Sequence, residues 1–105
     1  MTRMLLCAVE EIPDDEPLQR SVPGYGVLAV VKVDDHVYAI DDRCGHAGAS
    51  LALEGSLDGH VIECGWHEAR FDVRDGCPIS GPCESAQRSY AVTVEYGSVY
   101  VEIPD

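Results

Sequence analysis

Two mixed pairs of metal-ligating residues place the strongest constraint on what this chain can fold into. Cys44 and His46 form a C-x-H pair, Cys64 and His67 form a C-x2-H pair, and residues 47–63 separate them. Thiolates suit iron–sulfur clusters and zinc, and imidazole suits zinc, copper or iron. A zinc finger places its cysteines on one turn and its histidines on the next helix, whereas here each loop offers one ligand of each type. The spacing therefore predicts a metal site built by two loops.

The mixed pairs also indicate which metal centre to expect. If the two loops lie side by side, both sulfurs can face one metal ion and both imidazoles can face a second. This is the ligand set of a Rieske [2Fe–2S] centre, in which two histidines replace two cysteines on one iron. Gly45, Gly48 and Gly65 would let the backbone approach a bulky cluster because they lack a Cβ, although they can equally mark tight turns. Zinc bound by the same four residues remains the alternative.

The pattern along the chain predicts an all-β fold. Short strand-like stretches alternate with Gly, Asp and Pro turns, and no stretch keeps a helical period for three turns. Residues 77–87 are expected to be irregular because Pro78 and Pro82 interrupt them. The expected strands are 1–10, 27–33, 36–40, 60–63, 70–73, 90–95 and 98–103, with turns at 23–26, 34–35, 58–59, 74–76 and 96–97.

Length and charge limit the possible functions. The 105 residues are expected to form one domain, residues 1–105. Seven basic and 19 acidic side chains give a formal charge of −12, which argues against nucleic acid or anionic lipid as a partner. No apolar run is long enough to span a membrane, and the apolar patch near the start is too short for a signal peptide. We therefore expect a cytoplasmic protein with no membrane contact.

The cysteines outside the ligand pairs fit a reducing compartment. The chain has five cysteines in all, and Cys7, Cys77 and Cys83 are not used by the predicted centre. Three thiols cannot all pair within one chain, and in a reducing cytosol they need not pair. Cys77 and Cys83 could face each other across a loop, and Cys7 is expected to be a small core residue.

Beyond these features the chain resembles a known family, the small Rieske-type ferredoxins of bacterial aromatic ring-hydroxylating dioxygenase systems. The resemblance covers nearly the whole length. Two positions depart from the family pattern: residue 65 is Gly where many members have Pro, and residue 68 is Glu where many have Gly. Besides the ligand pairs, the stretches that carry the resemblance are 37–40, 49–51, 54–59, 69–76, 90–95 and 99–102.

The resemblance implies a fold, a cofactor and a role. The fold would be the Rieske fold, with antiparallel β-sandwich-like sheets and a small cluster-binding subdomain of two loops at about residues 42–70. One [2Fe–2S] cluster would be held by Cys44, His46, Cys64 and His67. The chain, expected to be a monomer, would carry one electron at a time from an NAD(P)H-dependent flavin reductase to a terminal ring-hydroxylating oxygenase in aromatic-compound degradation, and would not be catalytic alone.

The resemblance also predicts a low reduction potential. High-potential members of the wider family carry a second cysteine in each loop and hydroxyl side chains after the second ligand pair. Ala49 and Trp66 stand here at the cysteine positions, and Ala69 and Phe71 stand at the hydroxyl positions. Since hydrogen bonds to the sulfurs tune such centres, the potential is expected toward about −150 mV, the lower end of the Rieske range.

Two other readings of the sequence stay open. One is a small subunit or accessory domain of a nitrite-reductase-type enzyme, a class of similar fold that often lacks the four ligands. The other is a structural zinc-binding module for protein interaction, which would be colourless and redox-silent. Iron content and redox activity would separate both from an electron carrier.

Overall fold

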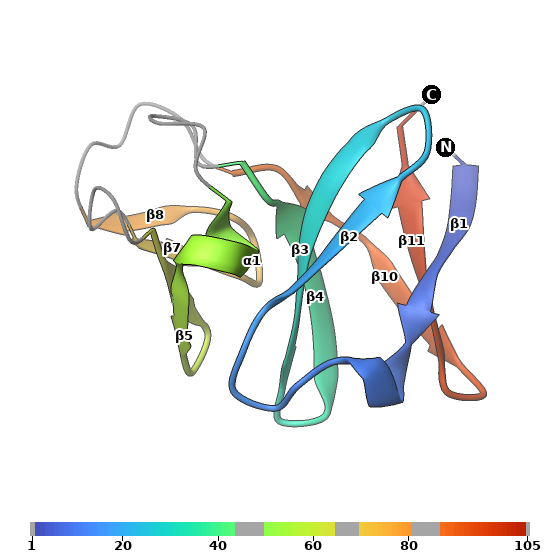
Figure 1. The fold of residues 1–105 in the computed structure, drawn as a ribbon, viewed down its shortest axis with the longest axis horizontal. Helices are drawn as coiled ribbons and strands as arrows, with labels where there is room; N and C mark the ends of the chain where they lie inside the picture. The colour runs from blue at the N-terminus through green and yellow to red at the C-terminus, as the bar shows by residue number, and fades with distance from the viewer. Residues whose placement is uncertain (1, 44–49, 65–69, 81–86, 105) are drawn as a thin grey trace.

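The computed structural model describes residues 2–43, 50–64, 70–80 and 87–104. These residues form three antiparallel sheets, one 3₁₀ helix and a single turn of α-helix. Figure 1 shows the sheets side by side, with the second sheet between the other two. The prediction of an all-β fold is confirmed. The division into one domain with a ligand-binding part at about residues 42–70 stays a prediction.

The first two sheets face each other across an apolar core. The first sheet has the order β1-β11-β10 and the second has the order β2-β3-β4-β9. Both contribute to a cluster that includes Leu6, Val22, Leu28, Val99 and Val101. The strands of these sheets are β1 (Thr2–Ala8), β10 (Val92–Glu95) and β11 (Ser98–Ile103), then β2 (Leu18–Val22), β3 (Gly26–Val33), β4 (His36–Asp41) and β9 (Ser89–Tyr90).

The third sheet is smaller and lies against the other face of the second sheet. Its order is β5-β6-β7-β8, and a helical turn, α1 (Leu51–Glu54), precedes it. A second apolar cluster joins Ala29 and Val31 of β3 to Ile62 and Phe71 of the third sheet. The strands of the third sheet are β5 (Ser56–Asp58), β6 (Val61–Glu63), β7 (Arg70–Asp72) and β8 (Pro78–Ser80).

Strand β3 is central because both of its faces are covered. Leu28 and Val30 belong to the core shared with the first sheet, whereas Ala29 and Val31 belong to the core shared with the third. All four side chains are at most 1% exposed. Successive side chains of a strand point to opposite faces, so an uninterrupted apolar run is what a strand buried on both faces requires. The predicted strand 27–33 is thereby confirmed as the centre of the molecule.

Two-residue turns set the register of the hairpins. Asp34 and Asp35 have φ angles of 52° and 66°, and Tyr96 and Gly97 have φ angles of 51° and 79°. Two consecutive residues with positive φ are typical of the tight turns whose twist matches paired antiparallel strands. The predicted turns at 34–35 and 96–97 are both confirmed.

Several predicted elements differ from the structure. Residues 77–87 were expected to be irregular, but Pro78–Ser80 is the edge strand β8, where a proline at the first residue costs no ladder hydrogen bond. The first strand ends at Ala8 instead of residue 10, because a 3₁₀ helix, η1 (Val9–Glu11), begins there. Ala8 N donates to Glu11 Oε2 at 2.7 Å and fixes this turn. Strands β2 and β5 and the helical turn α1 were not predicted.

Candidate metal centre

The structure describes one of the four predicted ligands. Cys44, His46 and His67 lie outside the described residues, so their assignment stays a prediction. Cys64 directly follows β6, and its side chain is 1% exposed. Its thiol is free of any disulfide. A buried, unpaired sulfur at the end of a strand is a suitable metal ligand, because only its lost proton is needed to make it a thiolate.

Antiparallel pairing brackets both ligand-bearing segments. Arg43 and Ser50 form an antiparallel bridge on either side of residues 44–49, which we call the first ligand segment. Glu63 and Arg70 are register partners of β6 and β7 on either side of residues 64–69, the second ligand segment. The residues that flank each ligand segment are therefore paired with each other.

The base of the first ligand segment is built on the carboxylate of Asp42. Its Oδ1 accepts a hydrogen bond from Ala52 N at 2.8 Å, and its Oδ2 accepts one from Gln19 Nε2 at 3.0 Å. Asp42 O accepts a third bond from Leu51 N at 2.8 Å. The residue is 3% exposed, and a hydrogen bond in a buried, low-dielectric environment is stronger than one in water. Asp42 therefore joins β2 and the start of α1 to the residues that precede Cys44.

Ser50 closes the other end of the same segment. Its Oγ accepts a hydrogen bond from Leu53 N at 3.0 Å and one from Gln19 Nε2 at 3.2 Å. The first of these is an N-cap interaction, which satisfies a backbone donor at the start of a helical turn. Asp42 and Ser50 thus share Gln19 as a partner, and the two ends of the first ligand segment are held by one network.

Gln87 forms the second connection to this base. Its Nε2 donates to Asp41 O at 2.9 Å and to Arg43 O at 2.7 Å, and the residue is 5% exposed. Asp42 and Gln87 are the buried polar residues among those described. Buried polar groups need partners because an unmade hydrogen bond costs free energy. Both residues fix the same short segment, Asp41–Arg43: Asp42 bonds it to Ala52 and Gln19, and Gln87 donates to its carbonyls.

Tyr90 adds a bond to the outer side of this base. Its hydroxyl donates to Asp41 Oδ1 at 2.5 Å and lies 2.5 Å from the hydroxyl of Tyr25. Burial raises the pKa of Tyr90 well above its ordinary value, and its bonds with Asp41 and Tyr25 raise that pKa further. Tyr90 therefore keeps its proton at physiological pH and stays a donor to Asp41.

The base of the second ligand segment is apolar. Cys64 belongs to the cluster that contains Leu51, Ile62 and Phe71, and each of these side chains is at most 1% exposed. Arg70 Nε lies 3.0 Å from Glu63 Oε2 across the strands, but this ion pair is largely open to solvent. Exposed pairs contribute little to stability, so apolar packing holds this base.

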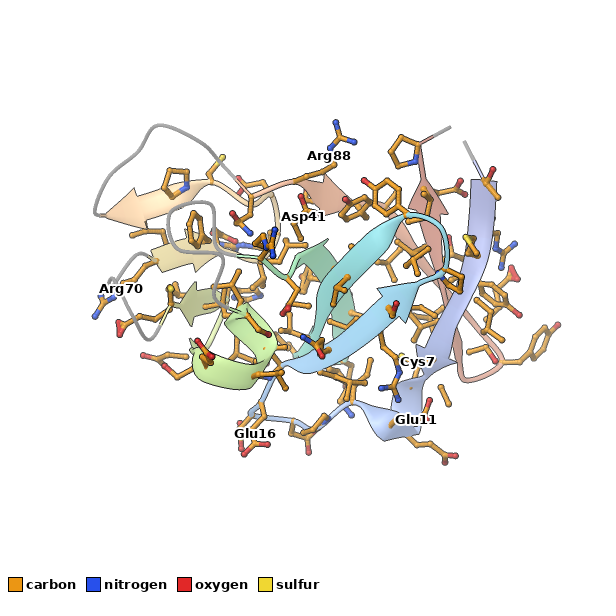
Figure 2. All side chains as sticks on the ribbon, turned by 45° about the horizontal axis from the view of Figure 1, so that its top comes forward. Cys7, Glu11, Glu16, Asp41, Arg70 and Arg88 are labelled. Carbon is orange, nitrogen blue, oxygen red and sulfur yellow. The ribbon has the colours of Figure 1, made fainter. Side chains whose placement is uncertain are left out.

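The structure describes two of the three cysteines outside the proposed ligand set. Cys7 is buried in the core between the first two sheets, as predicted (Figure 2). Cys77 is exposed and its thiol is free, and the nearby Asp75 carboxylate raises its pKa. Cys83 lies outside the described residues. Within residues 2–43, 50–64, 70–80 and 87–104, no three His, Cys, Asp or Glu side chains gather as a metal site.

Sequence reasoning did not assign roles to Asp42, Gln87 and Gln19. The position of Asp42 two residues before Cys44 was a usable signal, since a carboxylate beside a ligand can hold a loop. Gln87 and Gln19 gave no signal, because they are far from Cys44 in sequence and their contacts exist only after folding.

In the part of the chain that is described, no helix is long and apolar enough to cross a membrane.

Comparison with known proteins identifies the class that this fold and site define. Residues 2–91 match the family of the Rieske [2Fe-2S] domain. The chain therefore belongs to this family, and the predicted resemblance is confirmed. Membership implies one Rieske-type [2Fe–2S] cluster. The described residues fit such a group, because Cys64 offers a buried free sulfur, an isolated bridge flanks the first ligand segment and paired strand residues flank the second.

Individual relatives show which members of the family this chain is similar to. The chain is 43% identical to the ferredoxin component of the p-cumate 2,3-dioxygenase system of Pseudomonas putida, over 93% of this chain and 83% of that protein. It is 34% identical to the ferredoxin subunit of 3-phenylpropionate/cinnamic acid dioxygenase of Escherichia coli K12, over 100% of this chain and 97% of that protein. Both relatives are ferredoxins of dioxygenase systems.

Solved structures agree with this class. The Sphingomonas yanoikuyae B1 ferredoxin superposes with a TM-score of 0.91 at 35% identity, covering 98% of this chain and all of that one. A chain in a complex of reduced oxygenase and oxidised ferredoxin in carbazole 1,9a-dioxygenase has a TM-score of 0.86 at 39% identity, covering 94% and 91%. The predicted Rieske fold is confirmed.

Proposed function

We propose that this protein is a one-electron carrier of an aromatic ring-hydroxylating dioxygenase system. It would receive electrons from an NAD(P)H-dependent flavin reductase and pass them to a terminal oxygenase. The observation that carries this proposal is the family match over residues 2–91, which includes both mixed ligand pairs. Relatives that are ferredoxin components of dioxygenase systems support it, as does a related structure that contains an oxygenase together with its ferredoxin.

The proposed ligands are Cys44, His46, Cys64 and His67. In support, the two pairs fall within segments whose flanking residues pair with each other, by an isolated bridge at the first and by strand pairing at the second, and Cys64 provides a buried sulfur. When bound, a [2Fe–2S] cluster supplies the reversible uptake of one electron. By resemblance to the family, the two imidazoles would form the surface through which partners exchange that electron.

The remaining residues of the site hold the ligands and keep water away. Ile62 and Phe71 pack around Cys64, so its sulfur is shielded on the core side. Asp42 and Gln87 fix the residues that lead into Cys44. Solvent exclusion and outer hydrogen bonds both tune the potential of an iron–sulfur centre. The fold would therefore hold the ligands of the electron-carrying cluster in place.

We propose that the chain is not catalytic alone. Electron transfer requires no substrate pocket, and substrate pockets are usually lined by apolar side chains. A described cavity of about 360 Å³ is instead half lined by acidic residues; its lining is Asp14, Asp15, Asp34 and Asp35 together with Lys32, Val33, Leu57 and Gly59. Substrate chemistry is assigned to the partner oxygenase. We further propose that residues 1–105 form a single domain, that the protein is a monomer and that it acts in the cytoplasm.

A low potential completes the proposal. Phe71 is buried beside Cys64 and has no hydroxyl that could donate a hydrogen bond to a cluster sulfur. Such donors raise the potential of Rieske centres, so we expect a midpoint toward about −150 mV. This value suits an acceptor of electrons from a reduced flavin and does not suit quinol oxidation.

A redox titration of the purified protein tests this function. We expect uptake of about one electron per chain at a negative midpoint potential. Cys64→Ser should abolish this uptake, whereas the matched control Cys77→Ser should leave it unchanged, because Cys77 is exposed and outside the proposed ligand set. A midpoint above zero would contradict the low-potential role. Redox activity that persists in Cys64→Ser would contradict the ligand assignment.

A further inference from the structure

Gln87 uses both hydrogens of its side-chain amide on the entry to the first ligand segment. The two hydrogens of Nε2 are directed to Asp41 O at 2.9 Å and to Arg43 O at 2.7 Å. These two carbonyls flank Asp42, and Arg43 is the residue directly before Cys44. A primary amide can donate two hydrogen bonds from one nitrogen, a geometry that no apolar side chain can replace.

The backbone of Gln87 connects to the other side of the site. Its N–H donates to Gly76 O at 2.9 Å, and Gly76 N donates to Asp72 O at 2.7 Å. Asp72 ends β7, the strand that follows the second ligand segment. The approach is close, since a Cβ at Gly76 would lie 1.8 Å from Gln87 O, and Gly76 has a φ of +78°. One residue therefore links the entry of the first ligand segment to the hairpin that follows the second.

We propose that Gln87 is a positioning residue that fixes the spacing between the two ligand segments, and thereby the geometry and retention of the cluster. This inference rests on the proposed function. Its physical basis is that hydrogen bonds have directional geometry, whereas the apolar packing between the third sheet and β3 can be satisfied by small displacements. Without the amide, Asp41 O and Arg43 O lose their buried donor, and the residues before Cys44 are free to shift.

The first test compares Gln87→Leu with Arg88→Ala as its control. Leu has a similar volume but no donor, so we expect cluster loss in the presence of a chelator to become about tenfold faster. The midpoint potential and the g values of the reduced protein should also change. Arg88 is exposed, and its carbonyl accepts from Asp41 N. Its side chain points away from the ligand segments in Figure 2 and bonds to the Tyr25 hydroxyl, an exposed contact that contributes little. Arg88→Ala keeps that carbonyl and should match the wild type in all three measurements.

A second variant separates hydrogen bonding from side-chain shape. Gln87→Glu keeps the size of the side chain but presents a carboxylate, which has no hydrogen to donate, to two carbonyl oxygens. We expect it to lose the cluster at least as fast as Gln87→Leu at neutral pH. The difference from the wild type should narrow at acidic pH, because a protonated carboxyl group can donate to one of the carbonyls.

The outcomes separate this inference from the proposed function. A wild-type protein without an iron–sulfur signal would refute the proposed function itself. If the wild type shows the signal and both Gln87 variants match Arg88→Ala in cluster lifetime, potential and g values, only the positioning role is overturned. Gln87 variants that lack native β-structure by circular dichroism would also overturn it, because Gln87 would then serve general stability.

Discussion

At the first ligand segment the supporting residues are polar, whereas at the second they are apolar. Asp42 and Gln87 hold the residues before Cys44 with hydrogen bonds, while Phe71 and Ile62 surround Cys64 by packing. Directional bonds fix Asp42 and Arg43, which lie beyond the end of the paired strand β4. Packing suffices at the second segment because Cys64 already follows a paired strand, β6. Side-chain interactions therefore hold the part of each base that strand pairing alone does not hold.

The largest effect on stability is expected from a substitution in the apolar base of the second ligand segment. Phe71→Ala would leave a cavity beside Cys64, so we expect the free energy of unfolding to fall by about 3–5 kcal/mol. Chemical denaturation followed by circular dichroism measures this loss. Leu53→Ala is the control, since Leu53 is 70% exposed and should change stability little. A loss below about 1 kcal/mol for Phe71→Ala would show that packing does not support the second segment.

The next largest effect is expected from a substitution in the polar base of the first ligand segment, which Asp42 and Gln87 form. Asp42→Ala removes the acceptor of Ala52 N and Gln19 Nε2, and we expect stability to fall by about 2–3 kcal/mol. Amide hydrogen exchange should quicken at Leu51 and Ala52, while amides of β6 and β7 keep their protection. Asp15→Ala, at an exposed carboxylate, is the control. Equal loss of protection at both bases would mean that the two are one cooperative unit.

A smaller loss of stability is expected when the bond between Tyr90 and Asp41 is removed from the polar base. Tyr90→Phe removes the hydroxyl that donates to Asp41 Oδ1 and leaves the ring in place. We expect a loss of about 1 kcal/mol in the free energy of unfolding, measured by thermal or chemical denaturation. Tyr96→Phe should have no effect, because Tyr96 is fully exposed. If Tyr90→Phe proves as stable as the wild type, Asp41 needs no side-chain donor.

The smallest effect concerns the rim of the apolar base and depends on pH. The Arg74 guanidinium, bonded to Asp72 at 2.7 Å, holds the pKa of the Asp72 carboxyl below its ordinary value. A carboxylate whose pKa is lowered by folding stabilises the protein above its unfolded-state pKa, and this contribution is lost as the pH falls through the folded-state pKa. Asp72→Asn should therefore cost less than about 1 kcal/mol near neutrality and nothing in strong acid. A constant difference across acidic pH would contradict this ion pair.

Sequence and structure agree where a pattern is local. The central strand 27–33 and the turns at 34–35 and 96–97 are visible in neighbouring residues, because apolar runs and tight turns depend on short-range chemistry. The family match shows that the ligand pairs were a sound basis for predicting the class of protein.

The unpredicted features depend on tertiary contacts. Residues 18–22 read Leu-Gln-Arg-Ser-Val, a mostly polar stretch that forms β2 because β3 lies beside it. Pro78 suggested irregular chain, yet it begins an edge strand paired to β7. Gln87 gave no sign of its role, since the carbonyls it binds belong to residues more than forty positions earlier. Sequence patterns predicted the class of protein, but they do not reveal the residues that support the ligand segments.

The most direct test of the central claim is an electron paramagnetic resonance spectrum of the dithionite-reduced protein, with iron and acid-labile sulfide counted on the same sample. The account predicts an anisotropic signal characteristic of mixed histidine and cysteine ligation, with about two irons and two sulfides per chain. A silent spectrum from protein that contains zinc in place of iron would contradict it, and would leave a structural zinc module as the better description of the four ligands.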